Sequence, residues 1–126
     1  MIYPDSYRYT KEHEWIRVDG DVATVGITHF AQGALGDVVF VEMPAAGMHV
    51  KQMQQFGTVE SVKTISELYA PVSGEIVEVN GNLELHPEKV NQDPHDGGWM
   101  IKIRLADPAE VGNLMTAAAY AAVATE

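Results

Sequence analysis

The residues that could carry chemistry centre on one lysine. Lys63 lies between two runs of alternating apolar residues, and the side chains close to it are small or polar, which predicts an exposed position at the tip of a β-hairpin. One interpretation is a solvated lysine, lightly paired with Glu60 or Glu67. The other is covalent carrier chemistry, because a long stem on a rigid hairpin lets an acylated amine move between distant active sites. In that case the lysine is an attachment point and not a catalyst.

The other reactive side chains form weaker patterns. The chain contains no cysteine, so disulfides, thiolate metal sites and cysteine nucleophiles are excluded, and sulfur redox chemistry must come from an attached group. The histidines have no i, i+4 pair or other usual ligand spacing, so the sequence predicts no metal site; they are His13, His29, His49, His86 and His95. A small enzyme that uses Glu14 and a histidine as an acid/base pair stays open as an alternative.

Short β-strands must position these side chains. Runs rich in β-branched and aromatic residues, separated by Gly, Pro and Asn, predict strands over residues 14–18, 21–27, 37–42, 57–62, 65–69, 75–80 and 99–104. Asp19 and Gly20 predict a hairpin turn between the first two strands, because Gly readily adopts the positive φ that such turns require. The expected fold class is therefore mainly β.

Two segments predict helices. Residues 28–33 predict a single helical turn with Thr28 as its N-cap. Near the end of the chain, Asp107 as N-cap, Pro108 at the first helical position and Glu110 in a capping box predict a C-terminal α-helix over about 107–123. Its inward-facing stripe is expected to be Val111, Leu114, Met115, Ala118 and Ala122.

An internal similarity indicates how the strands are arranged. Residues 36–42 and 74–80 both begin with a Gly and an acidic residue and continue with β-type alternation. This similarity predicts two related sheets packed face to face, as a β-sandwich or flattened barrel. The alternative is a chance resemblance between two strands.

Length and charge limit the classes of partner. The 126 residues fit one domain, 1–126, and their formal net charge of -10 repels nucleic-acid phosphates and anionic lipid, so neither nucleic acid nor membrane is expected as a partner. Basic partner surfaces suit this charge. The N-terminus lacks a basic segment followed by an apolar core, which predicts a cytoplasmic protein, or one of the mitochondrial matrix only if a presequence has been removed.

Several blocks of sequence, in a single order, carry a resemblance to a known family. They lie at residues 9–15, 25–28, 31–32, 35–42, 60–63, 68–76, 90–91, 97–99 and 102–103. The densest are Glu60-Ser61-Val62-Lys63 and the following segment 68–76. In these blocks the sequence resembles the glycine cleavage system H protein family over nearly its whole length. The resemblance implies a lipoyl-domain fold (the barrel-sandwich hybrid) with a C-terminal α-helix and short helical turns.

The resemblance also implies a function. Lys63 would hold lipoic acid in amide linkage, as the arm that takes an aminomethyl group from a pyridoxal-phosphate glycine decarboxylase to a folate-dependent aminomethyltransferase. A flavin-dependent dihydrolipoamide dehydrogenase would then reoxidise the dithiol. The chain would be a monomer and a non-catalytic carrier. An H-like protein that relays lipoyl groups to other lipoate-dependent enzymes is the alternative in the same class.

The resemblance also implies roles for four acidic residues. Glu60 and Glu67 resemble the family's acidic residues that flank the modified lysine and mark the hairpin for the lipoate-attaching enzyme; the alternative is solvated charges that keep the tip soluble. Glu12 and Glu14 align with a cleft in which the loaded arm folds back, where a carboxylate pairs with its ammonium. The alternative places Glu14 on the wet face of the first strand, with Trp15 in the core.

Four positions depart from the family pattern. His29 stands where relatives usually carry an acidic residue, and Ala34 stands where some carry an imidazole; both are expected near the arm cleft. Met53 stands where relatives have a turn glycine, so a reshaped turn is expected, because Met adopts positive φ only at a cost. His95 stands where relatives commonly carry an aromatic residue that bears a hydroxyl group, so the family pattern does not predict how His95 packs.

Overall fold

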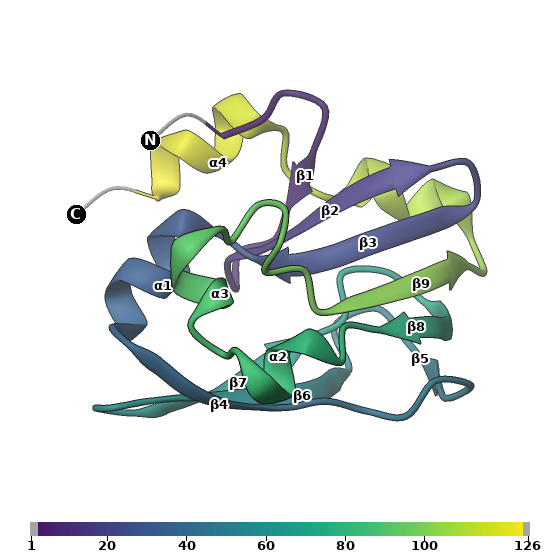
Figure 1. Ribbon diagram of the computed structural model, residues 1–126. Helices are drawn as coiled ribbons and strands as arrows, with labels where there is room; N and C mark the ends of the chain where they lie inside the picture. The colour runs from purple at the N-terminus through teal and green to yellow at the C-terminus, as the bar shows by residue number, and fades with distance from the viewer. Residues whose placement is uncertain (1–2, 125–126) are drawn as a thin grey trace.

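The computed structural model describes residues 3–124, which form two antiparallel sheets packed face to face (Figure 1). The larger sheet contains, in spatial order, β1 (Arg8–Tyr9), β2 (Glu14–Asp19), β3 (Val22–Ile27), β9 (Ile101–Leu105), β8 (Gly74–Val79) and β5 (His49–Val50). The smaller sheet contains β4 (Val38–Glu42), β6 (Gln55–Ser61) and β7 (Ile65–Tyr69). The expected mainly β fold of two sheets is confirmed.

The strand predictions agree closely with these elements. Each of the seven expected strands is present, with bounds within two residues of the prediction. Gly20 has φ 65° in the turn between β2 and β3, as the hairpin signal requires. The two similar segments form β4 in the smaller sheet and β8 in the larger one, which confirms the two-sheet interpretation. The strands β1 and β5 were missed because each has only two residues.

The main core lies between the two sheets. Because side chains alternate along a strand, each sheet turns one apolar face towards the other. Each fully buried aliphatic side chain there contributes roughly 1.5–3 kcal/mol relative to an exposed one. Members from both sheets include Val25, Ile27, Val41, Val59, Leu68, Ile76, Ile101 and Ile103.

A second cluster, the aromatic cluster, lies on the opposite face of β2. Ile16 belongs to the core between the sheets, whereas the adjacent Trp15 belongs to this cluster. Trp15 is fully buried, as expected, and a Cβ at the paired Gly26 would lie 2.7 Å from its indole ring, so only glycine fits there. The buried members of the aromatic cluster are Tyr7, Tyr9, Trp15, Ala117 and Tyr120.

Short helices connect several of the strands. The helix α1 (His29–Leu35) links β3 to β4, and α2 (Asn82–Leu85) and α3 (Lys89–Gln92) link β8 to β9. Figure 1 shows α1 and α3 side by side, next to the smaller sheet. Thr28 caps α1 by accepting a hydrogen bond from the Ala31 N–H, as the sequence predicts. Among residues 3–124, no helix is long and apolar enough to cross a membrane.

The C-terminal segment corrects one prediction. Instead of one helix over about 107–123, it forms a 3-10 helix, η1 (Pro108–Asn113), and a separate helix, α4 (Ala117–Val123). Between them Met115 pairs its backbone with Tyr9 of β1, which draws the chain out of helical geometry. Asp107 and Thr116 are the two N-caps.

The break also changes which residues of α4 face inward. Ala118 and Ala122, expected in the buried stripe, are exposed. Ala117 and Tyr120 are buried instead, because the helix restarts at a new N-cap with a different rotation. Figure 1 shows α4 on the outside of the larger sheet, next to the N-terminal segment.

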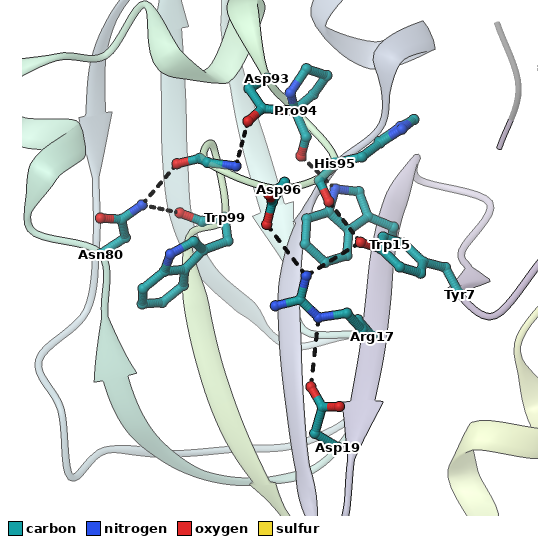
Figure 2. Close-up of polar contacts among 11 residues, drawn as sticks. Tyr7, Trp15, Arg17, Asp19, Asn80, Asp93, Pro94, His95, Asp96 and Trp99 are labelled. Carbon is teal, nitrogen blue, oxygen red and sulfur yellow. Dashed lines mark hydrogen bonds and ion pairs between the residues drawn. The ribbon is translucent and has the colours of Figure 1, made fainter. Parts of the chain in front are cut away.

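Polar contacts fasten the loop before β9 to β2 (Figure 2). The Trp15 indole N–H donates to the carbonyl of Pro94 at 2.8 Å, and the Tyr7 hydroxyl donates to the carbonyl of His95, also at 2.8 Å. Arg17 of β2 forms a salt bridge with Asp96 at 3.5 Å. These contacts hold His95 in place, next to the start of α1.

Candidate functional site

Lys63 lies at the apex of the hairpin formed by β6 and β7. Ser61 and Thr64 close the turn, since the Ser61 N–H donates to the Thr64 carbonyl at 2.8 Å. The Ser61 hydroxyl oxygen accepts from the N–H groups of Lys63 and Thr64, each at 3.2 Å. The backbone of the tip is therefore ordered by its own hydrogen bonds, while the Lys63 side chain is exposed. This is the placement that the sequence predicts.

The connection between α1 and β4 supports the tip from one side. The Val62 N–H donates to the Asp37 carbonyl at 3.0 Å. Asn91 of α3 fixes this connection, because its side-chain amide donates to the Gly36 carbonyl and its oxygen accepts from Val38. A Cβ at Gly36, which has φ 80°, would lie 3.4 Å from Lys63 Cε, so the lysine stem passes close to this glycine.

The charged end of Lys63 is free. Within residues 3–124 no salt bridge involves Lys63, so the light pairing with Glu60 or Glu67 does not occur. Glu60 pairs with Ile65 across the hairpin, and Glu67 pairs with Thr58. Both acidic side chains are thus on the hairpin that presents Lys63, without neutralising it.

A cleft of about 350 Å³ opens beside the tip. The side of β7 that follows the tip forms one wall and includes Ser66 and Glu67. The opposite wall is formed by α1 and by the turn that leads into β2, together with the first residue of that strand. Residues of this wall that line the cleft include Glu12, His13, Glu14, Phe30 and Ala34. The structure therefore brings Glu12 and Glu14 to a cleft next to Lys63, through elements that are distant in sequence.

Glu14 is the most unusual group of the cleft. Its side chain is only 1% exposed, which rules out the alternative on the wet face of the strand. One carboxylate oxygen accepts from the Thr10 hydroxyl at 2.5 Å, and the other accepts from the Tyr69 N–H at 3.2 Å. Burial raises the pKa of Glu14 to about 7, and these two hydrogen bonds act in the opposite direction. The carboxyl group is therefore close to half-ionised at neutral pH.

Glu12 differs from Glu14 in its exposure. It is exposed at the rim of the cleft, where its N–H donates to the Thr10 hydroxyl oxygen at 3.2 Å. The same oxygen accepts from the Glu14 N–H at 3.1 Å. Thr10 thus orders both acidic residues. Sequence reasoning missed Thr10, although its position two residues before Glu12 is typical of a local side-chain-to-backbone turn.

Two of the four departures from the family pattern were expected near the cleft. Ala34 lines the cleft, so the absence of a polar group there removes one possible partner for an arm. His29 is not among the residues that line the cleft, but it lies next to it in the chain, because the following residue, Phe30, is one of them. The His29 N–H donates to His95 Nε2 at 3.1 Å, so His95 satisfies the first turn of α1. Burial is the main cause that lowers the pKa of His95, which favours the neutral, accepting ring.

Met53 adopts the positive φ that is unfavourable for a residue other than glycine. It adopts φ 68°, in the left-handed region that favours glycine, at a cost of about 1–2 kcal/mol. Backbone hydrogen bonds hold it there, because the Met53 N–H donates to the Ala70 carbonyl and the Ala70 N–H donates to Gln54. Its side chain is 44% exposed and so meets little resistance.

The cleft is lined by apolar side chains and by three acidic residues, Glu12, Glu14 and Glu67. Such a lining fits an apolar arm that ends in a cation, and Lys63 stands where such an arm would be attached. No group of three potential metal-ligating side chains occurs within residues 3–124. The fold and the site together define a carrier domain: a sandwich of two sheets that presents one free amine on a rigid hairpin beside a cleft.

Comparisons with known proteins agree with this class. The family model described as glycine cleavage H-protein matches residues 7–126. The glycine cleavage system H protein of Symbiobacterium thermophilum is 58% identical over 123 residues, covering 98% of this chain and 96% of the relative. That of Brevibacillus brevis is 55% identical over the full length of both chains. The crystal structure of a glycine cleavage system H protein from Mycobacterium marinum superposes with a TM-score of 0.88 at 42% identity, covering 96% of this chain and 98% of that one.

The chain belongs to the glycine cleavage H-protein family. Members of this family carry lipoate, serve as the shuttle of the glycine cleavage system and are carriers, not enzymes. The similarity to the solved relative also identifies the fold as that of lipoyl domains, the barrel-sandwich hybrid. The alternative of a small acid/base enzyme built on Glu14 is therefore set aside.

Proposed function

We propose that Lys63 is the attachment site for lipoic acid, in amide linkage, and that the chain carries the aminomethyl group of glycine on this arm. The observation that carries the proposal is the free amine of Lys63 at the apex of an ordered hairpin, beside the cleft. The attached lipoyl group supplies the disulfide chemistry that a chain without cysteine lacks. Acylation also removes the positive charge of Lys63, so the extended side chain is uncharged along its length.

The residues around Lys63 have two further roles, which are to order the hairpin tip and to bind the loaded end of the arm. Ser61 and the backbone of Asp37 hold the base of the side chain still, so that motion is confined to the arm. The cleft beside the tip takes the loaded end, where the carboxylate of Glu14 or Glu12 pairs with an ammonium group. An approaching cation favours the ionised form of Glu14 and so lowers its pKa again. Exclusion of water from this pair protects the cargo from hydrolysis.

Glu60 and Glu67 form the proposed recognition site for the lipoate-attaching enzyme. Both lie on the hairpin of Lys63 and neither forms a salt bridge within the described part of the chain. Their charge therefore stays available to a basic surface of a partner, which raises the rate of encounter.

The proposed partners follow from the cargo. They are a pyridoxal-phosphate glycine decarboxylase, a folate-dependent aminomethyltransferase and a dihydrolipoamide dehydrogenase, besides the lipoate-attaching enzyme. The support is membership of the glycine cleavage family. A cytoplasmic location is part of the proposal, and its support is that the relatives compared come from bacteria.

Replacement of the lysine tests the proposal. Lys63→Arg keeps the charge but removes the primary amine, so the mass increment of one lipoyl group should disappear and reconstituted glycine cleavage should fall to background. Intact-mass measurement and the activity assay check both. The matched control is Lys51→Arg, an exposed lysine outside the hairpin tip, which should keep the increment and the activity. Both variants should unfold as the wild type does, within about 0.5 kcal/mol.

Two outcomes would contradict the proposal. A lipoyl increment that persists in Lys63→Arg, or that peptide mapping places on another lysine, overturns the attachment site. A chain that is lipoylated at Lys63, fails to support glycine cleavage and passes lipoyl groups to other acceptors would instead be the relay protein.

A further inference from the structure

His13 occupies a fixed position in the wall of the cleft. It has φ 71°, which is uncommon for any residue except glycine. Its N–H donates to the Thr10 carbonyl at 3.1 Å, and its own carbonyl accepts from the Thr28 N–H at 3.0 Å. The imidazole lines the cleft together with the Phe30 ring, whose centroid lies 4.8 Å away. The backbone of His13 is thus fixed by hydrogen bonds and its ring by the contact with Phe30. The sequence pattern did not predict this fixed position.

Two buried hydroxyl groups form a chain of hydrogen bonds that ends at this ring. The hydroxyl of Tyr120, from α4, lies 2.8 Å from His13 Nδ1 and 2.7 Å from Thr28 Oγ1. The exposed fractions of Tyr120 and Thr28 are both 0%. Thr28 Oγ1 also accepts from the Ala31 N–H at 3.2 Å. A chain of hydrogen bonds therefore runs from the start of α1, through the C-terminal helix, to the cleft.

The direction of this chain follows from its donors and acceptors. The Thr28 hydroxyl proton has one acceptor within hydrogen-bond distance among residues 3–124, the Tyr120 oxygen. Thr28 therefore donates to Tyr120, and the Tyr120 proton is left to donate to His13 Nδ1. A ring that accepts at Nδ1 carries its proton at Nε2. Protonation at Nδ1 would place two donors opposite each other in a buried position.

We propose that Tyr120 is a positioning residue of the arm cleft, which holds His13 as the neutral Nε2–H tautomer so that the cleft carboxylates stay available to the cationic end of the arm. The inference rests on the proposed function for its ligand, but the state of His13 is a property of the chain alone. A charged imidazole would attract the Glu12 carboxylate, whose charge already acts on His13, and would repel an ammonium group. A neutral imidazole neither attracts the carboxylate nor repels the ammonium group.

The groups that face His13 act on its charge in opposite directions. Glu12 and Glu14 flank it in its own segment, Glu67 faces the cleft from β7, and Tyr120 contacts it from α4. Burial lowers the pKa of His13, and the smaller effect of Glu12 raises it. The carboxylates that would favour an imidazolium are thus opposed by burial and by the hydroxyl chain.

Nitrogen NMR of the unmodified full chain tests the state of His13. With 15N-labelled histidine, the neutral ring should show an unprotonated Nδ1 and a protonated Nε2. Tyr120→Phe removes the donor, so both tautomers should appear and the titration midpoint of His13 should shift upward. Tyr9→Phe is the matched control, because it removes another buried hydroxyl of the aromatic cluster, one that donates to the Pro4 carbonyl. That control should leave the His13 signals unchanged.

Either of two NMR results overturns the positioning role. One is a neutral wild-type ring protonated at Nδ1. The other is a Tyr120→Phe ring with the wild-type tautomer and midpoint. Because this measurement needs no lipoyl group, its outcome is independent of the attachment at Lys63.

The role towards the cargo has its own readout. Hydrolysis of the loaded arm consumes one water and releases formaldehyde and ammonium, with the thiol left on the arm. In the lipoylated, aminomethyl-loaded protein, Tyr120→Phe should release formaldehyde several-fold faster than the wild type and Tyr9→Phe. Equal rates in all three, with the tautomer changed in Tyr120→Phe, would overturn the link between His13 and the cargo. Failure to lipoylate Lys63 would instead overturn the proposed function and leave the NMR result standing.

Discussion

Glu14 is a carboxyl group that the fold removes almost entirely from water. Its two hydrogen bonds, from Thr10 and from Tyr69, join the turn before β2 to strand β7. Burial outweighs them and raises the pKa of Glu14 to about 7 from its ordinary value of 4.5. A half-ionised carboxyl at neutral pH suits reversible binding of a cation, since the site charges when the cation arrives. The raised pKa also has a consequence for stability.

The unfolding free energy should depend on pH through Glu14. Between pH 4.5 and 7 the folded state holds this proton and the unfolded state does not, so stability falls as the pH rises through this window. The total loss is about 3 kcal/mol, because each tenfold change in a protonation equilibrium corresponds to roughly 1.4 kcal/mol. Glu14→Gln should lack this contribution, as measured by urea unfolding at pH 5 and pH 8.

The control for this prediction is the neighbouring exposed carboxyl. Glu12→Gln should keep the pH dependence of the wild type, because Glu12 is exposed at the rim of the cleft. If the wild type and Glu14→Gln lose equal stability between the two pH values, Glu14 is not the titrating group.

At the scale of elements, the hairpin that carries Lys63 depends on close contact with β4. At Gly57 of β6, a Cβ would lie 2.3 Å from the Glu42 carbonyl oxygen of β4. Neither backbone can retreat, because hydrogen bonds hold both strands in the smaller sheet. Gly33 in α1 is the opposite case, since a Cβ there meets nothing within 4 Å.

These two glycines should respond to alanine in opposite directions. Gly57→Ala should lower the unfolding free energy by about 3 kcal/mol or more, because backbone must move to relieve the overlap. Gly33→Ala should raise it by roughly 0.5–1 kcal/mol, because alanine restricts the unfolded chain and favours the helix. Urea denaturation measures both. A Gly57→Ala protein as stable as the wild type would show that β4 and β6 are less closely packed.

At the scale of the whole molecule, charge is unevenly compensated. The cations of β2 and β9 pair with acidic residues nearby, as in the salt bridges of Lys102 with Glu78 and of Arg104 with Glu75. Within the described part of the chain, no salt bridge involves β4, β6 or β7. The strands of the smaller sheet carry three acidic residues, Glu42, Glu60 and Glu67, and none of them forms a salt bridge with another residue in 3–124. If Glu60 and Glu67 mark the hairpin for the lipoate-attaching enzyme, as proposed, their uncompensated charge attracts a basic surface of that enzyme to the tip.

Lipoylation should therefore slow when the hairpin loses its charge. The double variant Glu60→Gln/Glu67→Gln should be lipoylated several-fold more slowly at low ionic strength, with a weaker dependence on salt. Initial rates over a salt series measure this. The control Asp21→Asn/Glu84→Gln also removes two carboxylates and changes the formal net charge from -10 to -8, but its two positions lie outside the hairpin. Equal slowing in both double variants would indicate an effect of net charge alone.

The sequence by itself determined the strands, the turn at Gly20 and the exposed position of Lys63. These features depend on neighbouring residues, because alternation and turn chemistry are local properties of the chain. The same local signals at Asp107 and Pro108 located the start of a helix correctly. They did not show where it ends, since the pairing of Met115 with Tyr9 interrupts it.

Only the tertiary structure decided the state of the cleft. Glu14 is buried because Tyr69 approaches it from a different sheet, and His13 is oriented by Tyr120, 107 residues further along the chain. Met53 adopts a positive φ because Ala70 holds its backbone. Burial, pKa and tautomer are set by atoms that approach in space from distant parts of the sequence. Local patterns carry no record of such approaches. This is the physical reason why the exposed position of Lys63 could be predicted from its neighbours, whereas the hydrogen bonds of Glu14 and the orientation of His13 could not.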